Sequence, residues 1–94
     1  MNQSISETFS DCERIRFDLI ETELDLGCTF VRIAADARND PVKQKRNTEN
    51  ARLAYDTACR LIARSLLNED QMTHLQARTE GLRHQLVALE EVIP

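Results

Sequence analysis

Apolar residues recur every three or four positions along most of the chain, which is the period of an amphipathic α-helix. The pattern first breaks at Asn39-Asp40-Pro41. A proline disfavours helical backbone in the residue before it and suits the first position of a new helix. Asp40 is a good N-cap for that helix. One helix is therefore predicted to end here and another to begin.

The second break lies at Asn68, which can cap a helix whose capping-box position is Gln71. Near the start of the chain, Ser10 and Glu13 form another capping box, and a competing box begins at Ser4. The predicted helices cover about residues 10–38, 41–67 and 69–91, with residues 1–9 frayed or forming an extra turn.

Both predicted connections are short, which makes consecutive helices antiparallel neighbours. Two glycines and two prolines in 94 residues are too few for an all-β fold. Residues 1–94 are thus predicted to form one all-α domain, an antiparallel three-helix bundle with a long first helix.

The second and third helices each have one apolar face. The third carries a narrow leucine seam of the coiled-coil type. Its members are Met72, Leu75, Thr79, Leu82, Leu86, Leu89 and Ile93. The second has a face of small residues that allows a neighbouring backbone to approach closely. That face consists of Ala51, Ala54, Ala58, Leu61, Ile62, Ser65 and Leu66, with Tyr55 and Cys59 at its edge.

The first helix has two apolar stripes, centred roughly 160° apart around its axis. The first stripe is Cys12, Ile15, Leu19, Leu26, Phe30, Ile33 and Ala37. The second stripe is Phe17, Ile20, Leu24, Cys28, Val31 and Ala35. One interpretation is that a three-helix core needs a wide apolar surface. The other is that the second stripe is an intermolecular surface, most simply a two-fold homodimer interface.

We adopt the second interpretation as the working hypothesis: a protein–protein interaction or assembly module that self-associates through its first helix. The partner-binding residues it predicts are Phe17, Ile20, Leu24, Val31 and Ala35. Gly27 is costly within a helix, so it predicts a close approach of another helix or a kink.

Charge is divided among the three segments. Residues 1–40 sum to −5, residues 41–67 to +4 and residues 68–94 to −3, which gives the net −4 of the chain. A basic helix between two acidic ones predicts complementary faces within the bundle. The basic cluster Lys43, Lys45 and Arg46 offers an alternative function as an anion-binding regulator. An acidic chain without interleaved aromatics argues against a nucleic-acid partner.

Two acid–histidine pairs on the third helix, Asp70 with His74 and Glu80 with His84, have the spacing of surface ion pairs. The same spacing allows a further alternative, a small metal-binding or enzymatic protein. No spacing suggests a catalytic constellation, and two glycines cannot form a glycine-rich phosphate loop. We therefore expect no enzyme activity, no cofactor and no small-molecule substrate.

The chain has three cysteines and no CxxC motif. This usage is typical of reduced thiols that act as small buried apolar residues. No apolar run is long enough for a membrane span, and the polar, acidic start differs from a secretory signal. These features predict a cytoplasmic location.

Two motifs resemble those of a known family. They are Ala51-x-x-x-Tyr55-x-x-Ala58 and Arg78-x-Glu80-x-Leu82-x-x-x-Leu86. Together with their surroundings, about two thirds of the chain, they are similar to tetratricopeptide-type hairpins and more so to the three-helix microtubule-interacting and trafficking domain. The chain departs from that domain in its longer first helix and its Asp-Pro junction. Members of the class bind helical peptides in grooves between helices, so the resemblance implies partner binding.

Overall fold

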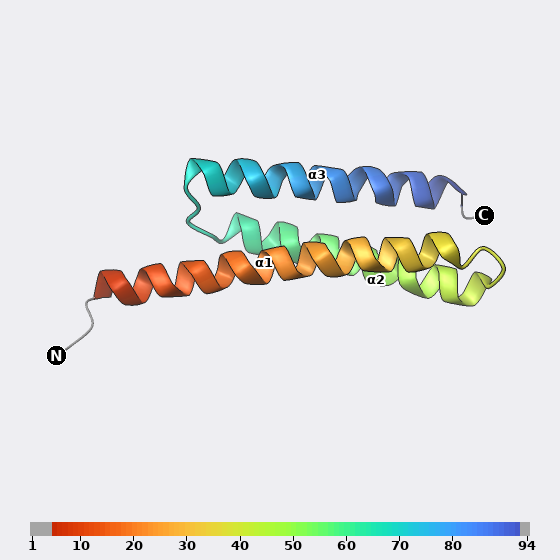
Figure 1. Cartoon of the computed structure of the whole chain (residues 1–94), viewed down its shortest axis with the longest axis horizontal. Helices are drawn as coiled ribbons and strands as arrows, with labels where there is room; N and C mark the ends of the chain where they lie inside the picture. The colour runs from red at the N-terminus through yellow and green to blue at the C-terminus, as the bar shows by residue number, and fades with distance from the viewer. Residues whose placement is uncertain (1–4, 93–94) are drawn as a thin grey trace.

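The chain folds into three consecutive antiparallel helices (Figure 1). The structure is a computed structural model that describes the backbone of residues 5–92 and the side chains of residues 8–91. The helices are α1 (Ile5–Asp36), α2 (Pro41–Ala63) and α3 (Glu69–Val92). This arrangement confirms the predicted all-α three-helix bundle.

The long first helix begins earlier than the Ser10 box predicts, because α1 is already helical at Ile5. The competing cap, Ser4, lies outside the described residues. At 1.5 Å per residue, the 32 residues of α1 span about 48 Å. The other two helices, with 23 and 24 residues, span about 35 Å each. The first turns of α1 therefore project beyond the rest of the bundle (Figure 1).

Both predicted helix starts at the loops are confirmed. The Asp40 side chain accepts a hydrogen bond from the Lys43 amide at 3.0 Å, with Pro41 in the first turn. At the next start, the Asn68 side chain accepts from the Gln71 amide at 2.8 Å, and Gln71 accepts from the Asn68 amide at 3.1 Å. This reciprocal pair is a complete capping box.

The end of α2 differs from the prediction, because the helix stops at Ala63 instead of residue 67. Two side chains of α1 hold the following loop. Arg16 donates to the Arg64 carbonyl at 2.8 Å, and the Glu13 carboxylate accepts from the Leu66 amide at 3.0 Å. Because these backbone groups are bound from outside the helix, the last predicted turn does not form. Leu66, expected on the buried face of the second helix, is exposed.

The core joins the small-residue face of α2 to α1. Ala51, Ala54 and Ala58 are buried there. A Cβ atom on Gly27 would lie 3.5 Å from the Ala54 Cβ and only 2.6 Å from a methyl carbon of Leu82. The close approach predicted from Gly27 is therefore confirmed.

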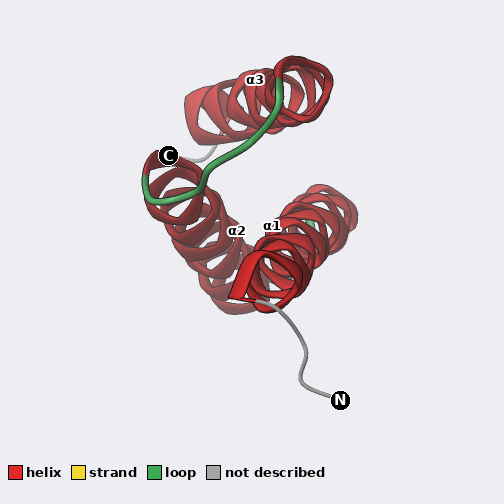
Figure 2. Cartoon of the chain, turned by 90° about the vertical axis from the view of Figure 1, so that its left-hand side faces the viewer, coloured by secondary structure: helices red, strands yellow, loops and turns green. Residues whose placement is uncertain are grey.

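The third helix covers one side of the α1–α2 pair (Figure 2). Its leucine seam is confirmed, with Leu75, Leu82, Leu86 and Leu89 buried. Ile93, the last predicted member, lies outside the described residues. In the part of the chain that the structure describes, no helix is long and apolar enough to cross a membrane.

Candidate interaction surface

The middle of the second stripe of α1 is not an outward surface, which corrects the sequence prediction for Ile20 and Leu24. Ile20 and Leu24 are completely buried, at 0% exposure, within the core of the single chain. Phe17 is half-buried, and its ring centroid lies 6.2 Å from that of His74 on α3. This part of the stripe is covered because α3 packs against it, a placement that the sequence pattern does not reveal. Ala35, at the end of the stripe, is exposed.

The N-terminal part of the first stripe faces outward, because it lies on the opposite side of α1, whereas Ala37 at its end is buried. Ile15, Leu19 and Leu26 are 64%, 46% and 43% exposed, and Leu53 of α2 is 61% exposed. Together with the half-buried Phe30 they form what we call the outer apolar face. A shallow hollow of about 280 Å³ in this face is lined by Glu23, Leu26, Phe30, Asn50, Leu53, Ala54 and Thr57.

Leu53 was missed in the sequence analysis, although a signal for it exists. It is a large apolar residue on the side of α2 away from the alanine face. The hollow shows that it lies next to Leu26 and Phe30, so two helices contribute to one apolar surface.

A basic edge borders this face on α2. Arg46 and Arg60 are seven residues before and after Leu53, and Arg64 is one turn beyond Arg60, so all three share its side of the helix. All three are exposed. None takes part in the ion pairs that the structure gives for residues 8–91.

An acidic edge borders the face on α1. Asp18, Asp25 and Asp36 are exposed, and their spacing of seven and eleven residues places them on one side of the helix. Arg14 and Arg32 lie on the same side. Arg14 is held 3.6 Å from an aspartate one turn earlier, which neutralises it locally.

An ion-pair network fixes α3 to α1. The Glu21 carboxylate lies 3.2 Å from both His74 and Arg78, and Arg78 also donates to Asp25. Burial lowers the pKa of Arg78, but the carboxylates of Asp25 and Glu21 outweigh it and raise that pKa above its ordinary value. The predicted pairing of His74 with Asp70 is wrong, because the His74 imidazole contacts Glu21 on α1 instead.

Charge complementarity was predicted between the basic α2 and both acidic helices, but within the described residues ion pairs join α2 only to α3. Arg52 of α2 pairs with Glu90 of α3. No ion pair given for residues 8–91 joins α1 to α2. Those two helices meet through small apolar side chains, and the arginines of the basic edge stay at the surface.

The second predicted acid–histidine pair is confirmed, with His84 3.1 Å from Glu80. Glu80 also accepts hydrogen bonds from Arg83, which lower the pKa of this carboxyl below its ordinary value of 4.5. Among the described residues, no group of three or more His, Cys, Asp or Glu side chains is placed to hold a metal ion.

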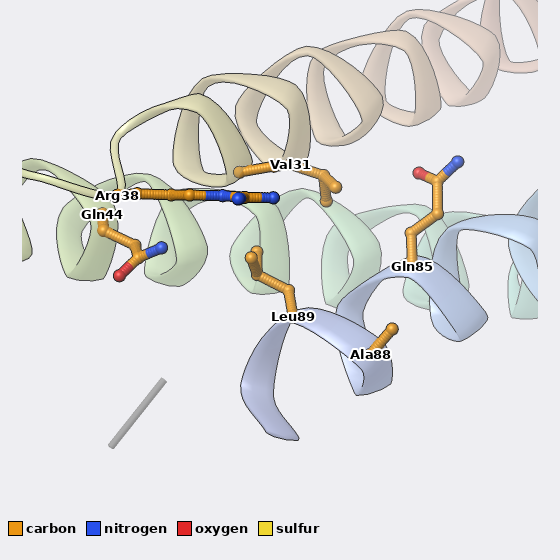
Figure 3. Close-up of a pocket in the computed structure, with 7 residues that line it drawn as sticks. Val31, Arg38, Gln44, Gln85, Ala88 and Leu89 are labelled. Carbon is orange, nitrogen blue, oxygen red and sulfur yellow. The ribbon is translucent and has the colours of Figure 1, made fainter. Parts of the chain in front are cut away.

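A groove of about 570 Å³ lies between α1 and α3 near the turn that joins α1 to α2 (Figure 3). Val31 and Ala35, the remaining members of the predicted partner surface, line it. The other lining residues are Arg38, Gln44, Gln85, Ala88 and Leu89. The Gln44 side chain donates to the Ala34 carbonyl at 3.1 Å, which fixes it at the rim. The groove is thus partly apolar, with an arginine beside it.

A second groove, of about 470 Å³, runs between α2 and α3 and includes Cys59 and Ile62. Beside it, burial and a hydrogen bond with Cys59 raise the pKa of Tyr55 above its ordinary value. The Arg52 guanidinium lies 5.7 Å from the centroid of the Tyr55 ring. Both contacts join side chains of α2 at the edge of this groove.

The predicted anion-binding residues do not form one cluster. Lys43, Lys45 and Arg46 are all exposed in the first turns of α2. Successive residues of a helix differ by 100°, so Lys45 points almost opposite to Lys43. Arg46 belongs to the basic edge described above.

Comparisons with known proteins give no relative for this chain: no family model, no curated protein and no solved structure matches it. The resemblance to the microtubule-interacting and trafficking domain therefore gains no support from them.

Proposed function

We propose that this protein is a helical assembly module that binds a second copy of itself through the outer apolar face. The observation that carries the proposal is the row of three exposed aliphatic residues on α1, Ile15, Leu19 and Leu26, which Leu53 widens onto α2. Contiguous exposed apolar surface of this kind is typical of protein–protein contact sites.

The outer apolar face is about half the size of a standard interface, which buries about 800 Å² on each partner. From Ile15 to Phe30 the face spans about 22 Å along α1. At a width of about 17 Å it supplies roughly 380 Å², so the charged edges and the neighbouring turns must contribute the rest of an interface. That width corresponds to α1 together with the adjoining half of α2, since packed helices lie 8–10 Å apart. The basic and acidic edges give this surface the charged rim common at interfaces.

The first test is the solution mass of the intact protein, measured by light scattering over a wide range of protein concentrations. We expect a dimer. Leu19→Glu and Leu26→Glu each place a carboxylate in the apolar centre of the interface in both copies, so each variant is expected to raise the dimer dissociation constant on the order of a hundredfold. Helical content, measured by circular dichroism, is expected to stay unchanged.

Two control variants locate the interface. Val87→Glu changes an exposed valine on α3 and is expected to leave the dimer intact. Ala88→Glu places the same charge in the groove between α1 and α3 and is also expected to be neutral. A monomer at every concentration would overturn the proposal. Dissociation by Ala88→Glu with no effect of Leu19→Glu would move the interface to the groove.

The cellular compartment remains a prediction. Cys12, Cys28 and Cys59 are free thiols, as expected of a protein in a reducing cytoplasm. Their environment differs from the prediction in one case, because Cys12 is exposed and only the other two are half-buried.

A further inference from the structure

We propose that the two copies pack in parallel. They are related by a two-fold axis that lies between them and runs parallel to α1. This inference rests on the proposed function and specifies the geometry of that same face. It follows from the order of charges across the face: first Asp18 and Asp36 on the acidic edge of α1, then the apolar residues, then the basic edge of α2. On the acidic edge, Asp25 is already bound by Arg78, and Arg32 adds one positive charge.

The direction of the symmetry axis decides which edges meet. A two-fold axis parallel to α1 places the basic edge of one copy opposite the acidic edge of the other. A two-fold axis in the plane of the face but perpendicular to α1 makes the helices antiparallel and places α2 opposite α2. With the axis near the level of residue 22, Arg60 would then face its own counterpart, and like charges juxtaposed in an interface cost binding free energy.

The heights of the charges along the bundle agree with the parallel arrangement. The hydrogen bond from Arg16 to the Arg64 carbonyl fixes Arg64 near the level of Arg16. Because α2 runs antiparallel to α1, Arg60 lies about one turn further along, at the level of Ile20 and about 3 Å from that of Asp18, which is within reach of an arginine side chain. A parallel two-fold axis preserves these levels, so Arg60 of one copy faces Asp18 of the other.

Neither member of this pair has a competing ion-pair partner within the described residues. Asp18 is exposed, and its backbone carbonyl accepts a hydrogen bond from the Thr22 hydroxyl at 3.0 Å. The Arg60 guanidinium donates to the neighbouring Thr57 hydroxyl at 3.2 Å. Both side chains can turn to a second copy without breaking a bridge inside the first.

A native thiol reports the orientation. Cys12 is exposed and belongs to the first stripe, which forms the centre of the interface. In a parallel dimer the two Cys12 side chains lie at the same level. In an antiparallel dimer centred near residue 22, they are separated by about 30 Å along the helices, and Cys12 lies instead opposite Ile33.

The experiment uses the full chain with Cys28→Ala and Cys59→Ala, so that Cys12 is the single thiol, and a second protein that adds Ile33→Cys. A short bis-maleimide is applied at a concentration where light scattering shows a dimer, and the linked peptides are identified by mass spectrometry. We expect links from 12 to 12 and from 33 to 33. Links from 12 to 33 would overturn the parallel arrangement. As a control, Cys12→Ser in the first protein removes its single thiol and should abolish all links.

A charge exchange tests the same geometry without cross-linking. Asp18→Arg and Arg60→Asp are each expected to raise the dimer dissociation constant on the order of tenfold, because symmetry places the altered pair in the interface twice. The double variant is expected to recover most of the loss. Failure of the double variant to recover overturns the Arg60–Asp18 pairing. A protein that is monomeric before any change refutes the proposed function itself, so the two failures are distinguishable.

Discussion

Gly27 and Gly81 have the same intrinsic cost within a helix but opposite surroundings. A Cβ atom on Gly27 would come within 2.6 Å of Leu82, whose side chain is completely enclosed by the core. A Cβ atom on Gly81 would meet no other group within 4 Å. Only the first glycine is required by packing, and the two positions therefore form a matched pair for mutation.

Replacing Gly81 with alanine is expected to stabilise the protein by about 0.5–1 kcal/mol, because alanine is the better helix former. For a domain of this size, that gain raises the melting temperature by roughly 2–8 °C. Gly27→Ala gains the same helical preference but must displace Leu82, and overpacking a core costs about 1–3 kcal/mol. Thermal unfolding of both variants checks this. Equal stabilisation at the two positions would show that Leu82 yields freely.

At the scale of the helices, the starts are set by chemistry between near neighbours in the sequence. The reciprocal hydrogen bonds of Asn68 and Gln71 fix the first turn of α3. Asn68→Ala is expected to lower the free energy of unfolding by about 1 kcal/mol, the usual value of an N-cap. Urea denaturation measures it. Combined with Gln71→Ala, the loss should be less than additive, since the first change already breaks the box. Strict additivity would mean that the box does not form.

The starts of α2 and α3 were therefore predictable from the sequence, whereas the end of α2 was not. The side chains that hold the end of α2 are Glu13, which is 53 residues from its partner Leu66, and Arg16, which is 48 residues from its partner Arg64. The sequence around Arg64 gives no sign of these distant contacts. A sequence pattern predicts a boundary when the atoms that create it are neighbours along the chain.

The two stripes of α1 show the same limit for the candidate surface. Both have helical spacing and similar apolar content, so the sequence correctly indicates that α1 is apolar on two sides. It does not tell which side α3 covers. That choice depends on how α3 crosses the α1–α2 pair, where Glu21 meets His74 and Arg78. The hypothesis that the second stripe is an intermolecular surface was wrong at Ile20 and Leu24 for this reason.

At the scale of the whole molecule, the bundle consists of a closely packed pair of helices and a less closely attached third one. The α1–α2 pair is joined through buried alanines and Gly27. The third helix is held by its leucine seam, but grooves of about 570 and 470 Å³ lie beside it, toward α1 and toward α2. Its attachment therefore depends more on a few contacts, among them the ion pairs of Arg78 with Glu21 and Asp25.

This difference predicts the order in which the molecule opens. In native-state hydrogen exchange, we expect the amides of α3 to exchange through a partial opening that costs less free energy than global unfolding. The amides of α2 around Ala51 and Ala54, and those of α1 packed against them, are expected to exchange more slowly. Arg78→Met removes the ion pairs but keeps much of the apolar stem, so it should speed exchange in α3 and leave the α1–α2 pair almost unchanged. Because the outer apolar face is built from α1 and α2 alone, the variant should still form a dimer. Exchange of all three helices with a single free energy would instead show that the bundle opens as one unit and that the seams of α3 are as strong as the α1–α2 contact.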